Sequence, residues 1–248
     1  MGRLWVGTSG WLYPEWYGIV YPGRPKKDEA FTLYRKRFDS VELNSTFYHF
    51  PQKSTVEKWE ALGGEDFTWS VKAWRWLTHI KCLKAPASDF NSFFSRTAPL
   101  TERKGVVLFQ LPPSMKQDLQ RLESFLKKVR DRVRVAVEFR HNSWFAPDTY
   151  EVLRSSGAAL VGVDAPGITR VLDVRTAPFA YFRLHGSSQW YSHNYSKKEL
   201  EVFAKAAARH LKEGDVYVYF DNTAGGDAFH NAETLREILK KSVHRRKS

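Results

Sequence analysis

The sequence predicts an α/β fold, a TIM-type (β/α)8 barrel with a closed parallel sheet. Two observations favour it: eight short strand-like runs alternate with mostly helical stretches, and the length of 248 residues suits one such barrel. We therefore expect one domain over residues 1–248, with a basic tail at about 240–248. An open doubly wound sheet is the alternative. The sequence has no nucleotide-cofactor motif, because no GxGxxG follows the first strand.

The predicted strands are short runs rich in β-branched and aromatic residues, as buried parallel strands are. The connection after the sixth strand, 166–178, has no clear helical pattern, so we expect an irregular or missing helix there. In chain order the strands cover 4–9, 40–47, 67–74, 105–111, 134–140, 158–164, 180–186 and 215–222.

Three of the connections have a clear helical pattern. In 116–131, apolar residues recur at helical spacing. A second helix, 196–213, opens with Ser196 and Glu199, the spacing of a capping box. A third helix covers 231–241.

Composition limits the compartment and the class of partner. Hydrophobic residues make up 42% of the chain, yet no apolar run approaches the roughly 20 residues of a transmembrane helix, so we expect no membrane partner. Cys82 is the only cysteine, which excludes an intramolecular disulfide and favours a reducing, cytoplasmic location. The formal net charge of +12 favours an anionic small molecule or nucleic acid as partner. No oligomeric state is indicated.

Polar residues recur on one face of the predicted strands. In the fifth strand, Val135 and Val137 point one way, and Glu138 and Arg140 point the other. In a barrel the apolar face meets the helices, so the polar face would point inward, near the strand ends where active sites of this fold lie. Four other strands show the same alternation of side chains. Their inward-facing residues would be Glu42 and Asn44; Ser70, Lys72 and Trp74; Leu160, Gly162 and Asp164; and Tyr181, Arg183 and His185.

A structural ion-pair layer is the alternative to an active site. Glu42, Lys72, Glu138, Arg140 and Arg183 would then neutralise one another inside the barrel, because buried charges are retained when paired. Both hypotheses hold together if the charged residues lower in the barrel support reacting residues nearer its mouth.

Seven segments occur in a fixed order along the chain: GTSGWLYPEWYG, FDSVELNSTFYHFP, FTWSVKAWRWLTH, VLFQLPPS, VEFRHNSWF, RLHGSSQWY and VYFDNTAGGDAFHNA. In this order they resemble the signatures of the YecE-like family, known as domain of unknown function 72. The resemblance spans nearly the whole chain and implies a TIM-type barrel, but no settled activity. A likeness of the family to endonuclease-IV-like barrels implies nucleic-acid action by analogy only. This chain has Asp221 where members often have Asn.

Glu138 is the first candidate for a general acid or base. Desolvation in a barrel mouth would raise its pKa and Arg140 would lower it, and the sequence leaves open which effect dominates. Glu42 is a second carboxylate, and two such groups are typical of glycoside hydrolysis. His185 and Asp164 are further catalytic candidates. With Glu138 and Asp221, they are also the candidate ligands of a divalent metal, although no local metal motif supports one.

The expected substrate-binding residues are mostly cationic. Arg140 and Arg183 would hold negative charge. Lys72 would form a Schiff base if its pKa were lowered, and an ion pair with Glu42 or Glu138 is the alternative. The amides Asn44 and Gln110, at strand ends, complete this group of candidates.

The segment 222–235, NTAGGDAFHNAETL, is the best candidate for an anion site. Asn222, Gly225 and Gly226 precede a predicted helix, glycine permits close backbone approach, and a helix N-terminus favours negative charge. A glycine-rich turn capped by Asn231 is the alternative.

Aromatic residues follow several predicted strands. Trp11, Trp144 and Trp190 are the candidates for stacking on bases or sugars. Packing that closes the barrel end is the alternative.

The sequence therefore predicts a hydrolase that acts at the C-terminal barrel mouth on a nucleotide or nucleic-acid phosphoester, by acid/base or metal-assisted chemistry. A non-catalytic nucleic-acid-binding module is one alternative. A carbohydrate-active enzyme that uses Glu42 and Glu138 is another. The sequence specifies no cofactor.

Overall fold

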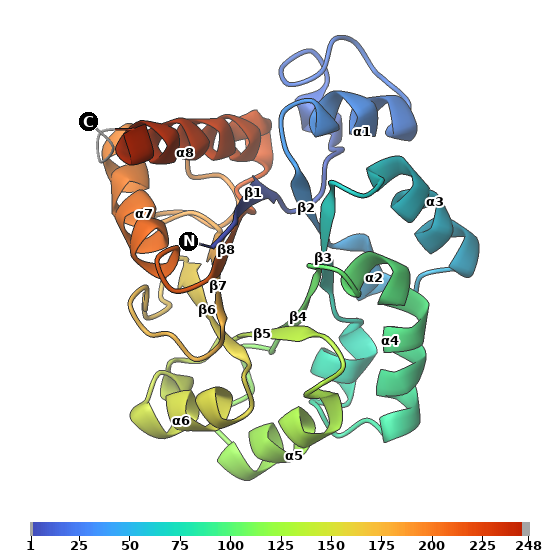
Figure 1. The fold of residues 1–248 in the computed structure, drawn as a ribbon, viewed down its shortest axis with the longest axis vertical. Coiled ribbons are helices and arrows are strands. Elements are labelled where there is room, and N and C mark those ends of the chain that lie inside the picture. Colours follow the sequence, from blue (N-terminus) through green and yellow to red (C-terminus); the bar gives the residue numbers. More distant parts are fainter. Residues whose placement is uncertain (1, 245–248) are drawn as a thin grey trace.

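The computed structural model describes residues 2–244 and confirms the TIM-type (β/α)8 barrel. All eight strands are parallel and form one sheet in the order β1-β8-β7-β6-β5-β4-β3-β2, at the centre of Figure 1. Residues 245–248 of the expected basic tail lie outside the described residues. The strands are β1 (Leu4–Thr8), β2 (Ser40–Leu43), β3 (Thr68–Lys72), β4 (Val106–Gln110), β5 (Arg134–Glu138), β6 (Ala159–Asp164), β7 (Phe179–Leu184) and β8 (Asp215–Phe220).

Helices surround the sheet in a ring (Figure 1). The connection from β6 to β7 contains no helix, which confirms the expected irregularity. No helix within residues 2–244 has the length and apolar character needed to cross a bilayer. The helices are α1 (Lys27–Arg35), α2 (Ser45–Tyr48), α3 (Lys53–Gly63), α4 (Ala87–Thr101), α5 (Leu119–Val129), α6 (Pro147–Ser155), α7 (Lys197–His210) and α8 (Asp227–His244).

A narrow seam between β1 and β2 closes the barrel. Ser9 forms a parallel bridge with Glu42 just beyond the end of β1. Lower down, the Tyr34 hydroxyl accepts from the Thr8 amide at 2.9 Å and donates to the Ser40 carbonyl at 3.0 Å. Gly7 belongs at this seam, because a Cβ there would lie 2.2 Å from the Ser40 carbonyl oxygen. One tyrosine from α1 thus replaces part of the missing strand ladder.

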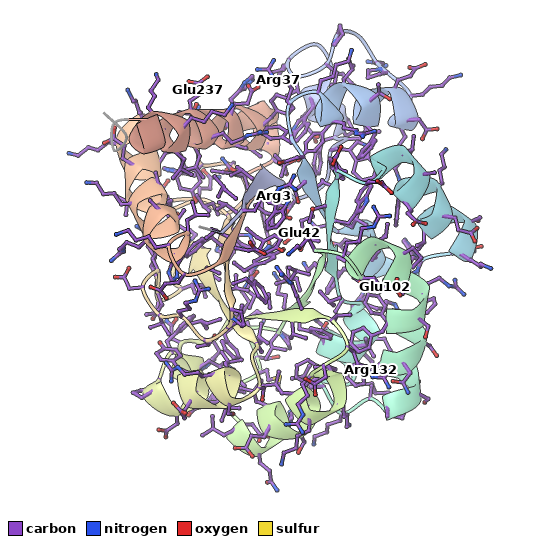
Figure 2. The ribbon with its side chains drawn as sticks, viewed as in Figure 1. Arg3, Arg37, Glu42, Glu102, Arg132 and Glu237 are labelled. Carbon is purple, nitrogen blue, oxygen red and sulfur yellow. The ribbon has the colours of Figure 1, made fainter. Side chains whose placement is uncertain are left out.

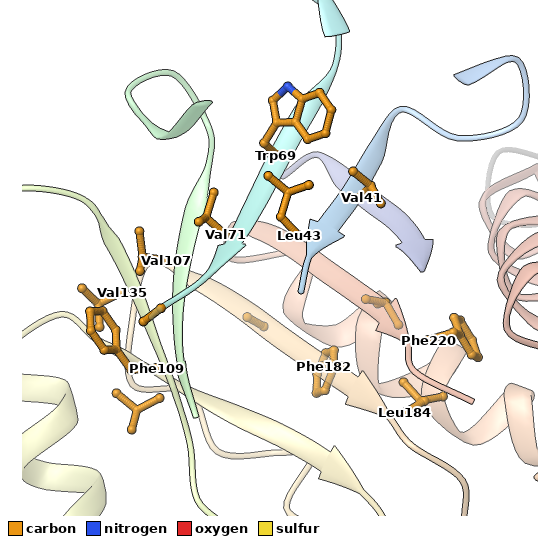
Figure 3. Close-up of a cluster of buried hydrophobic side chains, with 14 of the residues drawn as sticks. Val41, Leu43, Trp69, Val71, Val107, Phe109, Val135, Phe182, Leu184 and Phe220 are labelled. Atoms are coloured by element: carbon orange, nitrogen blue, oxygen red, sulfur yellow. The ribbon is translucent and has the colours of Figure 1, made fainter. Parts of the chain in front are cut away.

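Side-chain alternation divides the strands into an outer and an inner face. The outer face packs apolar side chains against the helices, as Figure 3 shows for β2, β3, β4 and β7. The inner face is also apolar in its lower part, where Trp5 stacks on Tyr217 with ring centroids 4.6 Å apart. Buried polar side chains therefore concentrate near the C-terminal ends of the strands.

The expected phase of β6 is wrong. Val161 and Val163 pack inside the barrel, in the same register rows as Tyr181 and Arg183 of β7. A Cβ on Gly162 would lie 2.5 Å from the outward-facing Phe182. Both faces of this strand are apolar, so hydrophobicity alone did not reveal which face points into the barrel.

The expected second strand, 40–47, is too long. β2 ends at Leu43 and the chain turns at once into α2. Asn44 is therefore the residue that precedes a helix, and it does not continue the inward face of β2.

Candidate active site

Arg183 of β7 lies at the centre of a buried charge cluster in the upper barrel. Its guanidinium donates to Glu42 Oε1 at 2.6 Å, to Glu138 Oε2 at 2.7 Å and to Asp221 Oδ2 at 3.1 Å. The carboxylates come from β2, β5 and the end of β8. Figure 2 shows Glu42 among the central strands, whereas Glu237 lies on an outer helix. One cation therefore holds together three acidic side chains from across the barrel.

Glu138 has no free oxygen. Besides Arg183, it accepts from Gln110 Nε2 at 2.9 Å and from Arg140 Nε. Burial alone would raise the pKa of Glu138, but Arg140 and Arg183 outweigh it and hold that pKa well below its usual value. Glu138 is thus an ionised, fully buried support, and not the available acid or base that the sequence suggested.

Glu42 is held in the same way. Its Oε1 accepts from Ser9 and Arg183, and its Oε2 accepts from the Tyr181 hydroxyl at 2.6 Å. Because Glu42 and Glu138 are both fully buried and both bound to Arg183, they do not form the exposed carboxylate pair that glycoside hydrolysis needs. Tyr181 was not among the expected site residues, although strand alternation had already put it on the inward face.

His185 extends the cluster toward Asp221. Its Nδ1 lies 2.9 Å from Asp221 Oδ2, within ion-pair distance but outside hydrogen-bond geometry. Its Nε2 lies 3.2 Å from Arg140 and from Arg183, and 3.3 Å from Glu138 Oε1. Burial raises the pKa of Asp221, but Arg183 and His185 oppose it, and the result is a pKa of about 2.

Lys72 ends β3 at the barrel mouth and is the one inward cation without a carboxylate partner in the described part of the chain. Its Nζ lies 4.3 Å from the centroid of the Phe47 ring, and the residue is 9% exposed. Burial, followed by the charge of Arg183, lowers the pKa of Lys72 to about 8. The ion pair expected with Glu42 or Glu138 is absent because both carboxylates are already occupied.

Arg140 lies over the cluster, just beyond β5. It pairs with Glu138, and its Cζ lies 4.5 Å from the centroid of the Trp190 ring. Trp190 also contacts His185, with ring centroids 5.3 Å apart. Arg140 is thus fixed from below by a carboxylate and from the side by an aromatic ring.

A family model described as "Protein of unknown function DUF72" matches residues 5–248. This chain belongs to the DUF72 family. UPF0759 protein YunF of Bacillus subtilis is 27% identical over 273 residues, which cover 95% of this chain and 94% of YunF. A solved DUF72 family protein from Thermotoga maritima is 31% identical, with a TM-score of 0.86 over 96% of this chain and 99% of that chain. A second, from Enterococcus faecalis, is 23% identical with a TM-score of 0.81, over 97% and 96%.

In this DUF72 protein, Asp164 lies apart from the charge cluster. The outward phase of β6 turns its carboxylate toward the Tyr195 hydroxyl and Ser187 Oγ, each at 2.6 Å, and toward Arg170. Asp164 therefore lies outside the group of charged residues with which it was expected to act. No group of three or more His, Cys, Asp or Glu side chains suited to a metal occurs within residues 2–244.

Four backbone amides of the glycine-rich loop of this DUF72 protein are already bonded to carbonyl groups of the chain. The amides of Ala224 and Ala228 already donate to the carbonyls of Tyr191 and Asn222, and those of Gly226 and Asp227 bond within the loop. Gly225 and Gly226 have positive φ angles of 63° and 85°, as a tight turn requires.

Asn222 anchors this loop. Its Nδ2 donates to the His193 carbonyl and to Asn231 Oδ1, each at 2.8 Å, while its Oδ1 is buried without a hydrogen-bond partner among the described residues. The turn alternative fits better than the anion-site expectation for Asn222, Gly225 and Gly226.

Two of the three expected stacking rings are packing residues. Trp11 lies edge-on to Phe31, and Trp144 stacks on Phe139 with ring centroids 4.6 Å apart. Trp144 is fully buried, whereas Trp11, although mostly buried, lines a cavity together with Asn44 and Tyr48. Of the three, Trp190 alone is partly exposed.

Tyr48 and Tyr191, which also follow predicted strands, are 62% and 47% exposed. Tyr48 lines a cavity of about 210 Å³ beside the mouth, together with Asn44, whose Oδ1 is buried and has no hydrogen-bond partner in the described chain. Both tyrosines follow strands that carry cluster residues, and that position was the available signal.

Proposed function

We propose that this DUF72 protein is an enzyme that binds an anionic substrate at the C-terminal barrel mouth and hydrolyses a nucleotide or nucleic-acid phosphoester. One observation carries the proposal. Glu42, Glu138 and Asp221 are held by Arg183. Two cations lie near the mouth: Lys72, which has no carboxylate partner among the described residues, and Arg140, which pairs with Glu138. An anion would bind where these cations lie.

Phosphoryl transfer suits such a site, because its catalysis is largely positioning and stabilisation of charge. In this proposal Arg140 holds a phosphate oxygen in a fixed direction. Lys72, whose pKa is about 8, holds a second oxygen and gives a proton to the leaving group. Asp221, ionised near neutral pH, orients the attacking water. Glu42 and Glu138 keep Arg183 and Arg140 in place.

The exposed rings explain a preference for nucleotides. Tyr48 and Tyr191 follow the strands that carry Glu42 and His185, and Trp190 lies beside Arg140. Exposed aromatic rings stack on bases with little regard to sequence. The single cysteine fits a reducing compartment, so the proposal places the enzyme in the cytoplasm.

The test is turnover of phosphodiesters, nucleoside monophosphates and short single-stranded DNA by wild type and by Lys72→Met. We expect Lys72→Met to lower kcat/KM by at least about 100-fold, the usual effect of losing an acid–base group. Lys212→Met, an exposed lysine next to the N-terminal end of β8, is the control and should match wild type.

Two outcomes would overturn the proposal. Equal turnover by wild type and Lys72→Met would show that the barrel mouth is not the active site. DNA binding that weakens steeply with salt, without turnover of any ester, would favour the non-catalytic nucleic-acid-binding alternative.

A further inference from the structure

Lys72 is held in place by the short helix α2. The Thr46 hydroxyl donates to the Lys72 carbonyl at 2.7 Å, which ties α2 to the end of β3. The next residue, Phe47, places its ring 4.3 Å from Lys72 Nζ. Both ends of the lysine are thus fixed by neighbouring residues of one helical turn, and the amine occupies a defined position at the mouth.

Every carboxylate near Lys72 is bound elsewhere. Glu42 accepts from Ser9, Arg183 and Tyr181, and Glu138 accepts from Gln110, Arg140 and Arg183. Asp221 contacts Arg183 and His185. Within the described residues, no carboxylate oxygen comes within ion-pair distance of Lys72 Nζ. An ammonium group that is both desolvated and close to another cation readily gives up its proton.

Burial, the largest effect, and the charge of Arg183 lower the pKa of Lys72, while Asp221, Glu138 and Glu42 raise it, and the result is a pKa of about 8. A fraction of the amine is therefore neutral near physiological pH. His79 packs edge-on against Phe47, with ring centroids 4.9 Å apart. Burial, together with Lys72 itself, lowers the pKa of His79 to about 4, so His79 is neutral at pH 7 and adds no charge.

From this geometry we infer that Lys72 is a nucleophile that forms an imine with a small aldehyde or ketone carrying a carboxylate or phosphate group. The Nζ lone pair attacks the carbonyl carbon and the C=O π electrons move to oxygen. A first proton passes from nitrogen to that oxygen and gives a carbinolamine, the second N–H proton follows, the oxygen leaves as water, and a neutral C=N bond remains. Arg140 binds the anionic group. This activity requires no phosphoester hydrolysis and goes beyond the proposed function.

The test traps the imine by reduction. Wild-type protein is incubated with glyoxylate and cyanoborohydride, and the modified lysines are identified by peptide mass spectrometry. We expect Lys72 to react at least about tenfold faster than exposed Lys212 at pH 8, because an ordinary lysine, with a pKa of about 10.4, is almost fully protonated there. Labelling of Lys72 should rise with a midpoint near its pKa of about 8.

A matched pair of aldehydes tests the class of substrate. Arg140→Gln should slow labelling by glyoxylate more than labelling by uncharged propionaldehyde, because only glyoxylate carries a carboxylate. Equal slowing of both aldehydes would overturn the assignment of an anionic substrate.

Labelling of Lys72 no faster than Lys212 in the wild type would overturn the inference itself. This comparison is made within one folded protein, so it does not depend on whether any variant folds. If the wild-type protein is labelled at Lys72 but hydrolyses no phosphoester, the imine inference stands and the proposed hydrolysis fails.

Discussion

At the scale of single residues, the decisive contrast is between Glu138 and Lys72. The sequence offered Glu138 as the reacting group, with Arg140 as the neighbour that would either perturb or disable it. The structure surrounds Glu138 with Arg183, Arg140 and Gln110, which leaves it ionised and structural. Lys72 was expected to form an ion pair with a carboxylate, but it has no such partner among the described residues, and its pKa is lowered. Glu138 thus has cationic partners, whereas Lys72 has no carboxylate partner within the described part of the chain.

Replacing Arg183 should cost more stability than any other single change in the cluster. Arg183→Met leaves Glu42 and Glu138 buried without their shared cation, and breaking a buried ion pair costs about 3–5 kcal/mol. Urea denaturation measures the free energy of unfolding. Arg140→Gln is the matched control and should cost less, because Arg140 is partly exposed. An Arg183→Met protein as stable as wild type would show that the cluster does not depend on this cation.

At the scale of elements, strand alternation predicted much of the site and failed where a strand is apolar on both faces. β2, β3, β5 and β7 each carry a polar residue between apolar ones, so their inward faces could be read directly. β6 carries valines on its inner face and Leu160 on its outer face. Which face points inward follows from its register with β7, the strand that carries Arg183. Asp164 was misplaced for that reason.

The barrel seam gives an element-scale prediction. Tyr34→Phe removes the hydroxyl that links the Thr8 amide to the Ser40 carbonyl, and both backbone groups are buried there. An unsatisfied buried polar group costs about 1–3 kcal/mol, so the free energy of unfolding should fall by that amount. Tyr48→Phe is the control, because Tyr48 is exposed. A Tyr34→Phe protein with wild-type stability in urea would mean that the seam does not need this bridge.

At the scale of the whole molecule, the side chains inside the barrel change in character along its axis. Aromatic and aliphatic side chains fill the lower interior, Arg183 binds three carboxylates above them, and Lys72 and Arg140 lie nearest the mouth. The sequence predicted the alternating fold and the identity of most polar members. It did not predict their partners, because residues as distant as Glu42 and Arg183 meet only when the barrel closes. Nor did it separate buried Trp144 from exposed Tyr48.

The central claim is that the mouth holds a desolvated lysine without a carboxylate partner. The most direct measurement is a pH titration of the Lys72 signal in protein labelled with [ε-13C]lysine, assigned by its loss in the Lys72→Arg spectrum. We predict that Lys72 titrates with a pKa of about 8, while exposed lysines titrate near 10.4. A Lys72 signal that titrates with the exposed lysines would contradict the account.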